Sequence, residues 1–179
     1  MLLALDISTS CTGYCLFDEN GLVDIGSINL SKHKGLYEKA KHVKAKIFEL
    51  GSKYRIHRVV VEENLQAFRP GLSSAKTLMT LAQFNGVVRW ICHEHLFVEI
   101  VAINVNTARK NVGLKINKKD KSKTTKEKVL DWVSVDDPSI KWPTKILKSG
   151  PNKGQQRICN EAYDMADAYV IGKSFLVEN

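Results

Sequence analysis

The first 17 residues read MLLALDISTSCTGYCLF, an apolar run that reaches an acid, Asp6, just before a cluster of small polar residues. The apolar run is typical of a buried strand, and Ser8, Thr9 and Ser10 then indicate a turn. An ionised aspartate at the end of a core strand is costly unless another group pairs with it. We therefore expect the rest of the chain to supply groups that compensate for Asp6.

The first third of the chain predicts an antiparallel three-strand meander followed by a helix. Residues 2–7, 13–17 and 22–30 read as strands, and Asn20-Gly21 is a strong hairpin signal. Apolar residues at steps of three and four predict a helix over 36–50 that Gly51 is placed to end.

The remaining elements predict parallel strands alternating with helices. Residues 58–64 contain Val59-Val60-Val61, typical of a central strand covered on both faces. A helix is expected over 73–95, with a buried stripe of Ala75, Leu78, Met79, Ala82 and Gly86. A strand over 98–103 follows, and then helices near 106–112, 125–133 and 160–175. Gly86 is expected to let another backbone approach closely. The order predicts an α/β fold with a five-stranded mixed sheet flanked by helices.

Composition and charge narrow the function. With 179 residues and 44% hydrophobic composition, we expect a single domain over 1–179; no apolar run suggests a membrane span or signal peptide, so we expect an intracellular protein. The four cysteines show no CxxC pairing, which favours reduced thiols.

The net charge is +8, and residues 115–157 hold twelve basic and five acidic residues, a difference of +7. We expect a basic loop region over about 113–157 and a polyanionic partner; a solvated lysine-rich loop is the simpler alternative.

Two acids in the last helix offer a partner for Asp6. Asp164 and Asp167 are three residues apart, so their carboxylates lie on one helix face. Two like charges about 4 Å apart cost on the order of 4 kcal/mol at an effective dielectric of ~20. The neighbouring Ala166, Ala168 and Val170 indicate a packed helix, so metal binding explains the pair better than a structural role.

A third acid ends the predicted central strand, as either Glu62 or Glu63, because side chains alternate along a strand and one of the two faces Asp6. Carboxylates suit Mg²⁺ or Mn²⁺, and two such ions can activate water and stabilise a leaving oxygen in phosphodiester hydrolysis. Together with the basic region, this predicts a metal-dependent nuclease.

Over nearly its whole length the sequence resembles the RuvC-like Holliday junction resolvases of the RNase H-like superfamily. The motifs that carry the resemblance are Asp6 before Thr12-Gly13-Tyr14, a glutamate after Val-Val-Val, Gln83 three residues before Gly86, and Asp164-Met-Ala-Asp167-Ala168. The turn departs from the family, with Ile7-Ser8-Thr9 where many members have Pro-Gly-Ser.

The resemblance implies an RNase H-like fold and a catalytic set of Asp6, Glu62, Asp164 and Asp167 that binds two Mg²⁺ ions, with Mn²⁺ as a substitute. It assigns Glu62 rather than Glu63 to the strand-end position. It also implies an assisting basic residue, for which Lys123 is the nearest match and Lys121 and Lys126 are alternatives. It further implies an aromatic wedge just after the strand-end glutamate. Leu65 occupies the closest position here, so Phe68, slightly later, is the candidate, with core packing as its simpler interpretation.

The implied activity is resolution of four-way or other branched DNA junctions, without a small-molecule cofactor or a membrane. Paired nicks in two strands require two sites in matching orientation, which predicts a homodimer. The expected DNA-binding residues are Phe68, Lys115, Lys118, Lys119, Lys121 and Lys126. Two alternatives are a non-catalytic branched-DNA-binding module, which the complete acid set disfavours, and an actin-like or sugar-kinase-like ATPase, which the chain's length disfavours.

Overall fold

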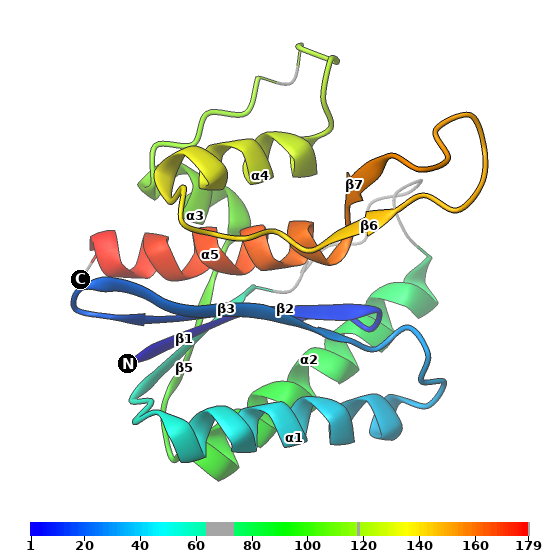
Figure 1. Ribbon diagram of the computed structural model, residues 1–179. Coiled ribbons are helices and arrows are strands. Elements are labelled where there is room, and N and C mark those ends of the chain that lie inside the picture. The colour runs from blue at the N-terminus through cyan, green and yellow to red at the C-terminus, as the bar shows by residue number, and fades with distance from the viewer. Residues whose placement is uncertain (64–73, 118, 179) are drawn as a thin grey trace.

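The computed structural model describes residues 1–63, 74–117 and 119–178 and contains the predicted five-stranded mixed sheet, in the order β3-β2-β1-β4-β5 (Figure 1). The first three strands form an antiparallel meander; the fourth pairs in parallel with the first, and the fifth pairs in parallel with the fourth. The strands are β1 Leu2–Asp6, β2 Cys11–Asp18, β3 Gly21–Asn29, β4 Arg58–Glu62 and β5 Ile100–Ile103.

Helices cover both faces of this sheet (Figure 1). One face carries α1, Leu36–Lys53, and α2, Ala75–Leu96; the other carries α5, Glu161–Glu178, with α3, Val105–Asn111, and α4, Thr125–Asp136, packed on it. Strand β1 serves both layers because its side chains alternate. Leu3 and Leu5 lie in the core beneath α1 and α2, while Leu2 and Ala4 lie in the core beneath α5.

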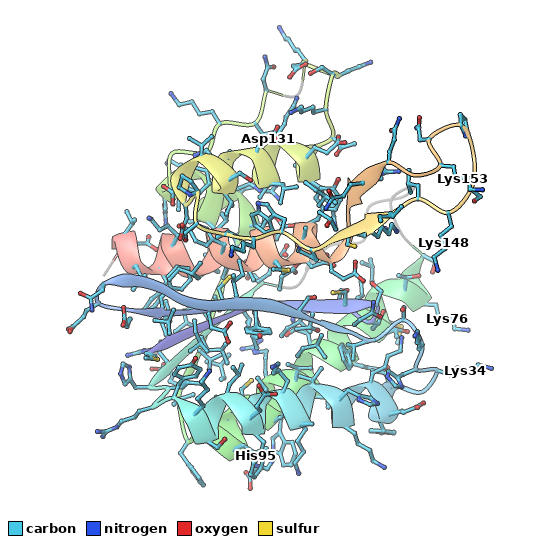
Figure 2. All side chains as sticks on the ribbon, in the orientation of Figure 1. Lys34, Lys76, His95, Asp131, Lys148 and Lys153 are labelled. Carbon is cyan, nitrogen blue, oxygen red and sulfur yellow. The ribbon has the colours of Figure 1, made fainter. Side chains whose placement is uncertain are left out.

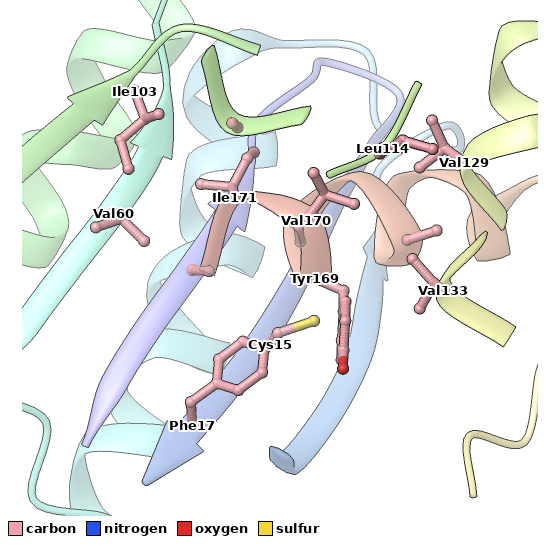
Figure 3. Close-up of a cluster of buried hydrophobic side chains, with 14 of the residues drawn as sticks. Cys15, Phe17, Val60, Ile103, Leu114, Val129, Val133, Tyr169, Val170 and Ile171 are labelled. Carbon is pink, nitrogen blue, oxygen red and sulfur yellow. The ribbon is translucent and has the colours of Figure 1, made fainter. Parts of the chain in front are cut away.

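The core beneath α5 fixes that helix against the sheet (Figure 3). The Phe17 and Tyr169 rings lie 5.4 Å apart at 58°, and the Tyr169 hydroxyl donates to Asp136 Oδ2 at 2.7 Å. At Gly172 an added Cβ would come within 2.9 Å of Ala4 Cβ, so a glycine is needed for α5 to approach β1 this closely. The helix that carries Asp164 and Asp167 is thereby held across the sheet.

Three sequence expectations about α1 and α2 are wrong. Helix α1 continues through Gly51 to Lys53, and a Cβ at Gly51 would lie 2.7 Å from Leu96 Cδ2, so this glycine admits α2 rather than ending α1. Helix α2 buries a different face, since Met79 is 64% exposed. Its buried residues are Phe84, Asn85, Val88, Ile91 and Cys92. Gly86 faces open space among the described residues, so none of their backbones approaches it from outside α2.

The basic region has more regular structure than the expected loop. Besides α4, it contains a two-stranded antiparallel hairpin of β6, Thr144–Ile146, and β7, Gln156–Ile158, which projects beyond the first turns of α5 (Figure 1). Helix α4 begins with a capping box in which Thr124 and Glu127 satisfy each other's backbone N–H groups. In the described part of the chain, no helix has both the length and the apolar character needed to cross a membrane.

Candidate active site

The ends of two neighbouring parallel strands bring Asp6 and Glu62 together. Leu5 of β1 is paired with Val61 of β4, so the next residue on each strand is an acid, and the charge of Glu62 acts on Asp6. Glu63 points differently: its N–H donates to the Ile103 carbonyl at 2.9 Å, and its carboxylate accepts from Asn104 Nδ2 at 3.4 Å. Strand alternation therefore selects Glu62 as the acid that faces Asp6.

Helix α5 brings Asp164 and Asp167 to the same place because β2 presents a glycine beneath it. Gly13 is paired with Asp6 across the β1–β2 ladder, and a Cβ at Gly13 would collide with the carbonyl group of Asp164. Any larger side chain at this position would push the helix away from the strand. The glycine of the Thr12-Gly13-Tyr14 motif thus sets the distance between the first acid and the last two.

The site gathers four acids, Asp6, Glu62, Asp164 and Asp167, and three of them, Asp6, Glu62 and Asp167, have raised pKa values. Burial raises the pKa of Asp6 well above its ordinary value, and the charges of Asp167, Glu62 and Asp164 raise it further. Burial, with the charge of Asp167, likewise raises the pKa of Glu62. The pKa of Asp167 is also raised, chiefly by burial. Such a cluster concentrates negative charge that bound cations would neutralise.

Two basic side chains already offset part of this charge. Lys126 Nζ lies 3.2 Å from Asp164 Oδ1, and Arg109 Nη2 lies 3.4 Å from Asp167 Oδ1. Partial burial alone lowers the pKa of Lys126, but the nearby carboxylates outweigh it and leave the pKa above its ordinary value. Among the described residues, no three of the four acids hold oxygens all within 4.8 Å of one another. Repulsion between the carboxylates and the pull of these two ion pairs both favour such a wide spacing of the acids.

The sequence singled out Lys123 as the assisting base, and the structure places it elsewhere. Lys123 Nζ lies 2.6 Å from Asp131 Oδ2 on the outer side of α4, whereas Lys126, one of the two alternatives, reaches the acids. Both belong to one lysine-rich run, so only the helix register of α4 distinguishes them. Arg109 was missed, because a basic residue in a short helix gives no sign that it points toward an acid on α5.

The remaining site residues lie on the surface or outside the described residues. Lys115, Lys119 and Lys121 are exposed, and Phe68 and Lys118 fall in the undescribed segments. Lys34 and Lys76 lie outside the predicted basic region. Figure 2 shows them, together with Lys148 and Lys153 of that region, on one side of the view, the side on which the loop between β1 and β2 also lies.

Comparisons with known proteins agree on the fold. No protein-family model matches the sequence, and no curated protein matches it. A structure of T. thermophilus RuvC in complex with a Holliday junction substrate is similar with a TM-score of 0.64 and 15% identity, covering 98% of this chain and 92% of that one. Another Thermus thermophilus RuvC structure gives 0.59 and 15%, covering 98% and 93%. The yeast mitochondrial Holliday junction resolvase Ydc2 gives 0.55 and 14%, covering 98% and 77%. The chain therefore has the RuvC-type, RNase H-like fold that its motifs predict.

Proposed function

We propose that this chain is a divalent-metal-dependent endonuclease that cuts four-way or other branched DNA junctions. The observation that carries the proposal is the meeting of four acids from separate parts of the sequence, at a cost shown by the raised pKa values of Asp6, Glu62 and Asp167. A fold-stabilising role would favour neutral or paired groups at these positions. The similar T. thermophilus RuvC structure holds a Holliday junction substrate, which supports branched DNA as the substrate class.

Asp6, Glu62, Asp164 and Asp167 would hold two Mg²⁺ ions, with Mn²⁺ as a substitute. The donor set fits, because all four ligands are hard carboxylates and their mutual repulsion leaves a negative site for a divalent cation. Bound ions would supply an activated water and stabilise the leaving oxygen of the phosphodiester. The sheet contributes rigidity, since Asp6 and Glu62 stand on paired strands and cannot separate without breaking the ladder.

Lys126 is the residue that we assign to the assisting basic role. Its ammonium lies against Asp164 while 57% of its side chain remains exposed, so it can contact both that acid and a phosphate that approaches from solvent. Arg109, only 18% exposed, instead holds Asp167 in place from the protein side. The two cations thus act differently, one toward substrate and one toward the scaffold.

The basic surface would bind the DNA backbone. Lys115, Lys119 and Lys121 lie in the loop before α4, and Lys148 and Lys153 lie in the β6–β7 connection. Contacts between lysines and phosphates provide most of the affinity of such complexes and weaken as salt is raised. We also propose a homodimer, because paired nicks on a four-way junction require two sites related by a two-fold axis.

The test uses end-labelled four-way, three-way and linear DNA with Mg²⁺, with Mn²⁺ or with chelator. We expect cleavage of branched DNA only with metal, and Asp6→Asn should abolish cleavage while leaving junction binding largely intact. Glu63→Gln is the matched control, since it removes the neighbouring acid that does not face Asp6. Binding without cleavage by the wild type would refute the nuclease assignment. Sedimentation as a monomer that makes single nicks would refute the dimer.

A further inference from the structure

A second group of metal-ligating side chains lies away from the four acids, at the beginning of α1. Glu38 and His42 are one helical turn apart on α1, and His33 precedes the helix in the connection from β3. One ligand atom from each of these residues lies within 4.8 Å of those of the other two. No other three His, Cys, Asp or Glu residues in the described part of the chain meet that condition.

The spacing of these donors suits a tetrahedral ion. His33 Nδ1 lies 3.1 Å from Glu38 Oε1. Two ligands bound about 2.0–2.1 Å from a tetrahedral Zn²⁺ stand roughly 3.3 Å apart, so an ion fits between this pair with little movement. The ring of His42 is stacked on that of His33, with centroids 3.7 Å apart and an interplanar angle of 27°. A torsional adjustment of exposed His42 would turn its ring nitrogen to the same ion.

The chemistry of the donors separates this site from the acids. Imidazole nitrogen prefers Zn²⁺, Cu²⁺ or Ni²⁺, whereas an all-carboxylate set prefers Mg²⁺ or Mn²⁺. His33 is 23% exposed and Glu38 55%, which leaves room for water as a fourth ligand.

We propose that His33, Glu38 and His42 form a surface site for a transition-metal ion of the Zn²⁺ class. The ion would fasten the β3–α1 connection to the first two turns of α1. The connection and the first turn of α1 contact the turn after Asp6, because Leu30 N–H donates to the Ser10 carbonyl at 2.8 Å and Lys39 Nζ, on α1, donates to the Thr9 carbonyl at 2.5 Å. The site is therefore placed to order the rim of the acid cluster without contributing a ligand to it.

Calorimetric titration with Zn²⁺ tests this proposal on the full chain, and its readout does not depend on nuclease activity. We expect one ion per chain whose affinity falls about 100-fold or more in His33→Ala and in His42→Ala, because losing a direct ligand costs at least as much as losing an outer-shell partner. Glu38→Gln, which preserves shape, should weaken binding in the same direction. Zn²⁺ should raise the melting temperature of the wild type but not that of His42→Ala.

Two controls show whether the loss is local. His57→Ala removes an exposed histidine near the N-terminal amine, and Glu49→Gln removes an exposed acid on the same helix; both should bind Zn²⁺ as the wild type does. Far-UV circular dichroism in chelator verifies that the variants are folded, as expected for changes at exposed or partly exposed positions. Equal Zn²⁺ affinity in the wild type and in the double variant His33→Ala/His42→Ala would overturn the proposal, as would an equal loss in His57→Ala.

Discussion

Replacing Asp6 with asparagine should stabilise the metal-free protein while abolishing its proposed activity. Ionised Asp6 is opposed by Asp167, Glu62 and Asp164 and attracted by Lys126. Each pair at ~6 Å and an effective dielectric of ~20 contributes about 3 kcal/mol. The three repulsions therefore exceed the one attraction, although exposure to water reduces the net cost.

Protonation of Asp6 sets an upper limit on the electrostatic cost of the cluster, because the carboxyl takes up a proton once repulsion costs more than protonation. Keeping a carboxyl of ordinary pKa 3.8 protonated at pH 7 costs at most about 4 kcal/mol, at about 1.4 kcal/mol per pH unit. We therefore expect Asp6→Asn to raise the free energy of unfolding by about 2–3 kcal/mol in chelator. For a chain of this size, that corresponds to a melting temperature higher by roughly 5–10 °C.

Thermal unfolding followed by circular dichroism, with chelator and then with Mg²⁺, measures this effect. Glu19→Gln is the matched control, because it makes the same change in net charge at an exposed turn and should leave the melting temperature within about 2 °C. In saturating Mg²⁺ the order should reverse, since the wild type gains binding energy that the variant lacks. A lower melting temperature for Asp6→Asn in chelator would refute the electrostatic account of the four acids.

The remaining predictions concern pH, the basic residues and two glycines. Because the pKa of Asp6 is raised in the folded state, ionised Asp6 destabilises the fold at neutral pH, and this destabilisation disappears as pH falls through the raised pKa toward 3.8. The stabilisation by Asp6→Asn, measured by urea unfolding in chelator, should therefore shrink from pH 7 to pH ~4. Lys126→Met should lower the single-turnover cleavage rate about 10- to 100-fold at saturating junction, whereas Lys123→Met should change that rate less than about twofold. A larger loss of rate in Lys123→Met would instead assign the assisting role to Lys123. Gly13→Ala should cost about 3 kcal/mol or more in urea unfolding, because the new methyl group meets the backbone of α5. Gly86→Ala should instead stabilise by up to ~1 kcal/mol, since its helical position opens on free space, and a destabilised Gly86→Ala would show that space to be filled.

The sheet was predictable because its signals are local. Apolar runs ending in Asp6 and Glu62, and the Asn20-Gly21 turn, fix strand positions without knowledge of distant residues. The buried face of α2 was not predictable in this way. Small and apolar residues occur on several faces of this helix, so its sequence does not single out one buried face. Which face is buried, that of Phe84 or that of Met79, depends on how α2 packs against α1.

The acids of the candidate site were predictable, but the cations beside them were not. Carboxylates at strand ends and in a packed helix are conspicuous because their environment is unfavourable to them. Lysines are ordinary on any surface, so Lys123 and Lys126 look alike until α4 fixes which one turns toward Asp164. Arg109 is recognised only once α3 is seen packed on α5.

The contact between Gly13 and the Asp164 carbonyl bears on when the site can assemble during synthesis. A nascent chain that has emerged only as far as β5 already contains Asp6 and Glu62, yet its sheet lacks the helix that rests on Gly13. The last two acids arrive only with α5, and the first two cannot complete the set alone. Chain order therefore delays formation of the complete acid set until α5 has been made and has docked.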